Sequence, residues 1–96
     1  MRRPTIQWLG PELNQCVPTG GRMLVVAGST RPLRAVDFLV DGKPVASVHR
    51  GTAGLYSAPL RSGRLARGTH LLRAVVHDRG GRTAAANRRV KVCRKP

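Results

Sequence analysis

Three histidines and four carboxylates are the side chains of this sequence that can move protons or bind metal ions. They are His49, His70, His77, Glu12, Asp37, Asp41 and Asp78. Acid–base catalysis requires two such groups facing one cleft, and a calcium site requires several clustered oxygen ligands. The spacing shows neither grouping. Asp41 and Asp78 both fall in predicted turns, where turn geometry is a sufficient reason for an aspartate.

The histidines do not combine into a metal site. His70 and His77 fall on opposite faces of one predicted strand, so they cannot hold one ion jointly. We expect His77 and His49 to be solvated. A Ser/His/Asp triad built on Ser47 or Ser57 lacks any motif that would position the nucleophile. The sequence therefore predicts a protein that is not an enzyme, with no catalytic residue, no metal and no cofactor.

Two cysteines, Cys16 and Cys93, lie 77 residues apart. A structural zinc site would need four clustered ligands, so a disulfide is the simpler interpretation. Two free buried thiols are the alternative. A disulfide would join the start of the fold to its last strand, and in the chain-entropy model it would stabilise the fold by about 4 kcal/mol. It would also place the protein in a secreted, periplasmic or cell-surface setting.

Positive charge dominates the composition, with 18 Lys and Arg against 4 Asp and Glu, a formal net charge of +14. Such a balance implies attraction to nucleic acid, anionic lipid or an acidic wall polymer, whereas the plainer interpretation is a solvated Arg-rich surface. The candidate anion-binding residues are Arg61, Arg64, Arg67, Arg73, Arg79, Arg82, Arg88, Arg89, Lys91 and Arg94. Sequence-specific nucleic-acid recognition is not expected, because no recognition helix and too few stacking aromatics are present.

Turn residues divide the chain into short apolar segments, which is typical of an all-β protein. The predicted strands are residues 5–9, 23–27, 34–40, 44–48, 55–60, 69–77 and a last strand that carries Val90 and Val92. Their core must be mainly aliphatic, because aromatic residues make up only 3% of the chain. Two antiparallel sheets packed face to face are the expected arrangement of about seven strands.

Alternation assigns the inward face of most strands. Val36, Phe38 and Val40 point one way, and Asp41-Gly42 supplies the positive φ angles of a tight hairpin. In the segments 55–60 and 69–77 the inward residues are Tyr56, Ala58, Leu60, Leu72, Ala74 and Val76, with His70 on the same side. The run 23–27 is apolar throughout, so its inward face stays undecided. Pro44 suggests that its strand lies at a sheet edge.

The segments 34–40 and 69–77 also have outward-facing residues, and this outer face is a candidate surface for contacts. Leu39, Leu71 and Val75 would lie there, either as a packing face for a neighbouring domain or a second copy, or as scattered surface aliphatics. Pairing of the last two strands is expected to set Arg73 beside Arg89 or Lys91, where repulsion favours a bound anion.

The order and spacing of several short motifs resemble bacterial immunoglobulin-like (Ig-like) domains. The matching residues are Val36-Asp37-Phe38-Leu39-Val40-Asp41-Gly42, Gly54-Leu55-Tyr56, Leu65, Gly68-Thr69-His70, Leu72, Ala74, Val76, Asp78, Gly81 and the closing Val90-Lys91-Val92. The resemblance covers residues 22–93. It implies an Ig-like β-sandwich that serves as a spacer, stalk or accessory module of secreted or surface proteins. His70 lies near the position where Ig folds place a tyrosine that bonds back to the backbone, so a structural hydrogen bond is expected there.

These observations predict one Ig-like domain over residues 1–96, with a core from 5 to 93 and a basic tail at 94–96. We expect a non-catalytic structural or accessory module of a longer extracytoplasmic protein, which contacts neighbouring domains or another protein. The alternative is a polyanion-binding module that uses the Arg-rich loops and the last strand. No segment approaches the ~20 apolar residues of a membrane span, and no signal peptide is visible.

Overall fold

Seven β-strands form from the apolar segments between the turns. The computed structural model describes residues 4–17, 21–29, 32–61 and 64–93, so the predicted basic tail at 94–96, with Arg94, lies outside the described residues. The strands are β1 (Thr5–Gly10), β2 (Arg22–Gly28), β3 (Leu33–Val40), β4 (Lys43–Val48), β5 (Leu55–Pro59), β6 (Gly68–Asp78) and β7 (Thr83–Val92). In the described part of the chain, no helix has the length and apolar character of a membrane span.

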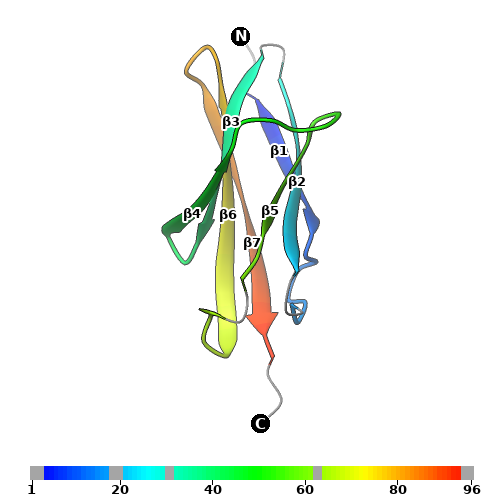
Figure 1. Cartoon of the computed structure of the whole chain (residues 1–96), viewed down its shortest axis with the longest axis vertical. Helices are drawn as coiled ribbons and strands as arrows, with labels where there is room; N and C mark the ends of the chain where they lie inside the picture. The colour runs from blue at the N-terminus through cyan, green and yellow to red at the C-terminus, as the bar shows by residue number, and fades with distance from the viewer. Residues whose placement is uncertain (1–3, 18–20, 30–31, 62–63, 94–96) are drawn as a thin grey trace.

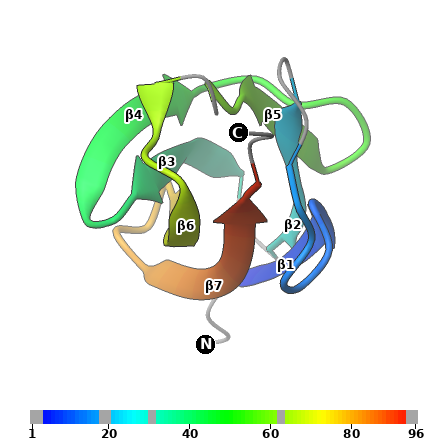
Figure 2. The same ribbon diagram turned by 90° about the horizontal axis from the view of Figure 1, so that it is seen from below.

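The strands form two antiparallel sheets that pack face to face. One sheet has the order β1-β2-β5 and the other the order β4-β3-β6-β7. Figure 1 shows the strands running along the long axis, and the end-on view of Figure 2 shows the two layers around a shared interior. The predicted β-sandwich of about seven strands in two sheets is therefore confirmed.

Period-two alternation places the core as expected. Val36 and Phe38 of β3 and Leu72, Ala74 and Val76 of β6 are fully buried. Met23, Val25 and Ala27 are the buried residues of β2, which settles the face that its apolar run left open. Burial of alternate aliphatic side chains from both sheets contributes roughly 25 cal/mol per Å² of apolar surface and is the main stabilising term of the fold.

The few aromatic residues also lie in this core, which is less purely aliphatic than the composition suggests. Trp8, Phe38 and Tyr56 are all buried. The rings of Trp8 and Phe38 meet edge to face, with centroids 6.1 Å apart and planes inclined by 70°. Because β1 and β3 belong to different sheets, this contact joins the two layers at their centre.

Two tight turns follow from residues that accept positive φ. Asp41 and Gly42 have φ values of 52° and 83°, which matches the predicted two-residue hairpin between β3 and β4. Gly54 has φ of 82° before β5, and a Cβ there would lie 2.9 Å from the Ala27 carbonyl oxygen. A side chain at this position would therefore push β2 and β5 apart.

The two edge strands of the four-stranded sheet, β4 and β7, have features that the sequence predicts only in part. β4 is an edge strand, as Pro44 predicts, and it contains a bulge because Phe38 pairs with Ala46 while Leu39 pairs with Pro44. Val45 is the residue left without a partner on β3. At the opposite edge, β7 begins at Thr83, well before the segment that its Val90 and Val92 pattern indicated.

Candidate functional site

A disulfide joins Cys16 to Cys93, with Cα atoms 5.5 Å apart, which confirms the predicted pairing. The neighbouring backbone is paired as well. The Val17 N–H donates to the Lys91 carbonyl (2.9 Å), and the Lys91 N–H donates to the Gln15 carbonyl (2.9 Å). The segment around Cys16 therefore runs along the end of β7 as a short parallel partner.

Further contacts close this side of the sandwich. The Trp8 indole N–H donates to the Ala86 carbonyl (2.9 Å), and Arg88 Nη2 donates to the Trp8 carbonyl (3.1 Å). Side chains thus link β1 and β7, which belong to different sheets, and Figure 2 shows these strands side by side. Arg88 is therefore committed to a structural contact, although the sequence placed it among the anion-binding candidates.

His70 sits in a polar cluster that ties three segments together. Its Nδ1 lies 2.5 Å from Asp41 Oδ2 and its Nε2 lies 2.6 Å from the Ala66 carbonyl oxygen. The Leu71 N–H donates to Asp41 Oδ1 (2.9 Å), and the Asp41 N–H donates to the Leu71 carbonyl (2.8 Å). The β3–β4 hairpin, the start of β6 and the connection before it are joined here, so the expected structural hydrogen bond of His70 is confirmed.

Both ring nitrogens of His70 face oxygen acceptors, which favours the doubly protonated imidazolium. The hydrogen bond to Asp41, followed by the one to the Ala66 carbonyl, raises the pKa of His70 above its ordinary value. The hydrogen bond from His70, followed by the one from the Leu71 N–H, lowers the pKa of Asp41. The His70 side chain is only 11% exposed, so the ion pair is a structural link and offers little surface to a substrate.

His77 is partly exposed, and it also has a carboxylate partner that the expectation of a solvated side chain did not include. Its Nε2 lies 2.9 Å from Asp37 Oδ2, and Ser47 Oγ donates to Asp37 Oδ1 (2.6 Å). These residues form an exposed polar row on the outer face of β4, β3 and β6. His49 is exposed, as predicted. In the described ranges, no three His, Cys, Asp or Glu side chains come together as a metal site.

Asp78 closes the β6–β7 turn, in agreement with its predicted role. It is only 2% exposed, and its Oδ1 accepts a hydrogen bond from the Arg82 N–H (2.9 Å), while its Oδ2 has no hydrogen-bond partner. The Asp78 N–H also donates to the Arg82 carbonyl (3.0 Å). The carboxylate is thus used for turn geometry.

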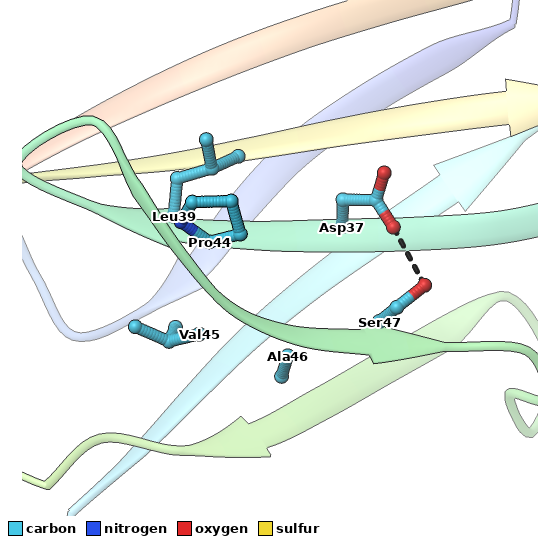
Figure 3. A pocket seen from close by; sticks show the side chains of 6 residues that line it. All are labelled: Asp37, Leu39, Pro44, Val45, Ala46 and Ser47. Carbon is cyan, nitrogen blue, oxygen red and sulfur yellow. Dashed lines mark hydrogen bonds between the residues drawn. The ribbon is translucent and has the colours of Figure 1, made fainter.

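The predicted packing face is interrupted by an arginine. Leu71 is 43% exposed, while Leu39 and Val75 are half-buried. Leu39 pairs with Arg73, which also lies between Leu71 and Val75 along β6. Leu39 instead lines an open hollow of about 410 Å³ with Asp37, Pro44, Val45, Ala46 and Ser47. Figure 3 shows Leu39 beside Pro44 at one end and Asp37 bonded to Ser47 at the other.

The register of β6 and β7 contradicts the expected crowding of like charges. Arg73 pairs with Asn87, and its Nη1 donates to Asn87 Oδ1 (3.4 Å). Arg89 lies opposite Leu71, and Lys91 lies opposite Thr69. The sequence placed Arg73 beside Arg89 or Lys91 because the start of β7 was not recognised, and an anion is not needed to relieve repulsion between directly opposed residues.

The remaining basic candidates lie in several places. Arg61, Arg64 and Arg67 are exposed in the connection between β5 and β6, at the other end of the strands from the β6–β7 turn that carries Arg79 and Arg82. Among the described residues other than Arg82, no arginine or lysine forms an ion pair with a carboxylate, and the two ion pairs seen there involve His70 and His77.

The structure contains a second cluster of basic residues, which the sequence pattern did not predict. Leu33, Arg34, His49, Arg50 and Arg79 line a hollow of about 600 Å³ that is open to solvent. Only Arg79 was a candidate beforehand. Arg34 lies far along the chain from His49 and Arg50, and the pairing of β3 with β4 is what brings it close to them.

Solved structures with the same fold match this chain at low sequence identity. The fibronectin(III)-like modules of Clostridium thermocellum CbhA match with a TM-score of 0.78 and 21% identity over 96% of this chain and 47% of that chain. The endo-β-1,4-mannanase from Thermotoga petrophila matches with a TM-score of 0.82 and 15% identity over 99% and 21% of the two chains. An engineered protein matches with a TM-score of 0.70 and 18% identity over 96% and 20%.

No protein-family model and no curated protein matches the sequence. The chain spans about half, or about one fifth, of the length of these solved chains. At such identities the likeness concerns the fold alone. The chain is therefore an Ig-like β-sandwich that shares its fold with fibronectin(III)-like modules.

Proposed function

We propose that this chain is a non-catalytic structural or accessory module of a larger secreted or cell-surface protein, of the bacterial Ig-like kind that its motifs resemble. The observation that carries the proposal is that the polar side chains of the described residues mostly stabilise the β-sandwich itself. Most of the described histidines and carboxylates serve turns and structural links, and in the one hollow that Asp37, His49 and His77 line together, Asp37 is already bonded to His77 and Ser47. The similar solved chains, in which this fold is a part of a longer polypeptide, support an accessory role.

The covalent link between Cys16 and Cys93 supports the proposed extracytoplasmic setting. Disulfides persist in oxidising compartments and are rare in the cytosol. Mass spectrometry of the native protein without reductant should show a mass about two units below that of the dithiol form, because disulfide formation removes two hydrogens. Complete alkylation of both cysteines without reduction would contradict this placement.

The proposed docking surface is the outer face of β3, β4 and β6 around Leu39. We would compare thermal unfolding of the isolated chain with that of the same module joined to the adjoining domains of its parent protein. Docking should raise the unfolding temperature of the module. Leu39→Ser should abolish that gain, and Leu13→Ser, at an exposed leucine away from this face, should not. Equal unfolding temperatures in both contexts would refute docking.

The alternative function is polyanion binding, and one observation favours it. Apart from Arg82, the described arginines and lysines form no ion pair with a carboxylate, so most of the positive charge is not neutralised within the described part of the fold. Binding of this kind weakens steeply with salt, because each neutralised anion releases a counterion. Retention on a heparin column that does not change between low and high salt would exclude it.

A further inference from the structure

The hollow lined by Arg34, His49, Arg50 and Arg79 combines three guanidinium groups with an imidazole, and no carboxylate lines it. Its residues come from three separate segments: the start of β3, the residues after β4 and the turn after β6. We define these four side chains as the basic hollow. Such a grouping presents many N–H donors to one small volume of solvent.

The backbone beneath the basic hollow is held by hydrogen bonds. The Arg79 N–H donates to the Pro32 carbonyl (3.0 Å), which fixes the β6–β7 turn against the start of β3. The Gly81 N–H closes the same turn by donating to the Asp78 carbonyl (3.2 Å). Val36 pairs with Val48, which sets β3 beside the end of β4. The backbone at Arg34 and Arg79 is therefore held before a ligand binds, which lowers the ordering cost of binding there.

The side chains of the basic hollow are not engaged elsewhere. In the part of the chain that the structure describes, none of the four forms a side-chain hydrogen bond or an ion pair. Arg73 and Arg88, by contrast, donate to Asn87 and to the Trp8 carbonyl. Like charges that share one hollow repel each other, and an anion bound among them removes that cost.

A second hollow continues from the first along the outer face. It has a volume of about 270 Å³, shares Arg34 and His49 with the basic hollow, and adds Ser47 and His77. Asp37 also lines this second hollow, and its carboxylate is held by Ser47 and His77. The two hollows adjoin at Arg34 and His49, with the guanidinium groups at the Arg79 end and the Asp37 carboxylate at the Ser47 end, so the anion site is confined to the basic hollow and a longer ligand could extend over the polar second hollow.

We propose that the basic hollow binds a carboxylate or phosphate group of an anionic polymer. Guanidinium groups match both oxyanions through paired N–H donors, which explains a site built from arginine. This inference rests on the polyanion-binding alternative above, and it locates that binding at the β6–β7 end, away from Arg61, Arg64 and Arg67.

Two triple variants test the location. Arg34→Ser, Arg50→Ser and Arg79→Ser together empty the basic hollow, and Arg61→Ser, Arg64→Ser and Arg67→Ser remove the same charge from the other end. Binding to polygalacturonate, which carries carboxylates, and to inorganic polyphosphate is measured by titration across a range of salt concentrations. The first variant should bind about tenfold or more weakly and lose about two units of the slope of log K against log salt, while the second should change little.

A conservative lysine variant controls for a loss of binding that is caused by misfolding. Arg34→Lys, Arg50→Lys and Arg79→Lys keep the charge and lose the paired donors, so affinity should fall although the long-range field is unchanged. Binding of only one of the two polymers assigns the oxyanion, and binding of both supports the shared chemistry. An equal loss in the two serine variants would overturn the site and leave polyanion binding in place. If the unmodified chain binds neither polymer, both proposals fail.

Discussion

The two sides of the sandwich, where one sheet meets the other, are closed by different interactions. On the β1–β7 side a disulfide, a buried indole and a short parallel strand join the sheets. On the β4–β5 side, no hydrogen bond joins the two strands in the described ranges, and Val40, Val45, Pro59, Leu60, Arg61, Arg64 and Leu65 line a hollow of about 320 Å³. The first side is built for stability, and the second leaves surface available for contacts.

An ion pair stabilises the end of the β4–β5 side that lies near the β3–β4 hairpin. His70 links Asp41 in the β3–β4 hairpin to Ala66, next to the residues that line the hollow. Covalent and apolar contacts do not depend on pH, whereas an ion pair does. The comparison therefore predicts that the stability of the β1–β7 side depends on the disulfide and on packing. Part of the stability of the β4–β5 side should depend on the protonation of His70 and Asp41.

Removal of the disulfide should have the largest effect. The double variant Cys16→Ser and Cys93→Ser should lose about 4 kcal/mol of unfolding free energy, because the unfolded chain regains the entropy of a long loop. Denaturant unfolding measures the loss. Hydrogen exchange should show that the Val17 N–H, which pairs with Lys91, loses protection before the β3–β6 pairs. A loss below about 1 kcal/mol would show that the closed side does not depend on this bond.

Trp8→Phe tests the polar part of the same side. The phenyl ring keeps most of the contact with Phe38 but cannot donate to the Ala86 carbonyl, so about 1–3 kcal/mol should be lost. Tyr56→Phe on β5 is the control, because the tyrosine hydroxyl has no hydrogen bond in the described part of the structure and the variant should be nearly neutral. If both variants lose equal stability, the indole N–H is not a special link between the sheets.

The His70–Asp41 pair predicts a dependence on pH. The pKa of His70 is raised in the folded protein, so its contribution is complete below the unfolded pKa near 6.5 and is lost as pH rises through the folded pKa. The pKa of Asp41 is lowered, so its contribution is complete above the unfolded pKa near 3.9 and is lost as pH falls through the folded value. Stability from this pair is therefore greatest between these unfolded values.

Thermal unfolding from pH 3 to pH 9 would test this, with His70→Gln as the reference. Because the Asp41 side chain is 45% exposed, solvent screening should keep the effect to about 1 kcal/mol, which corresponds to roughly 4–8 °C in unfolding temperature. The difference between the unmodified chain and the variant should shrink above pH 6.5 and again at low pH. A difference that stays constant across this range would mean that His70 acts by packing alone.

The sequence predicts the parts of the molecule whose signals are local. Alternation around Phe38 and Leu72 gives the inner faces of β3 and β6, and Asp41-Gly42 gives the hairpin between β3 and β4. The start of β7 could not be predicted in the same way, because its alanines have little strand preference and pair only because the long β6 lies beside them.

The basic hollow shows the same limit for the candidate site. Arg34, Arg50 and Arg79 lie far apart in the sequence, and only the pairing of the strands and the hydrogen bond from Arg79 to Pro32 bring them together. Arg61, Arg64 and Arg67 attracted notice instead because they are close in sequence. Proximity along the chain is a poor guide to charge clusters in an all-β fold, where most contacts are non-local.

The smallest effect is expected at the open side. Val45, the bulge residue of β4, is 52% exposed and lines both the β4–β5 hollow and the hollow of Figure 3. Val45→Ala should change the unfolding free energy by less than about 0.5 kcal/mol, because little buried surface is lost. Within the proposed module, the same variant should weaken contacts to a partner that covers this edge. A loss above about 2 kcal/mol in the isolated chain would show that the open side is in fact packed core, and the contrast between the two sides would then disappear.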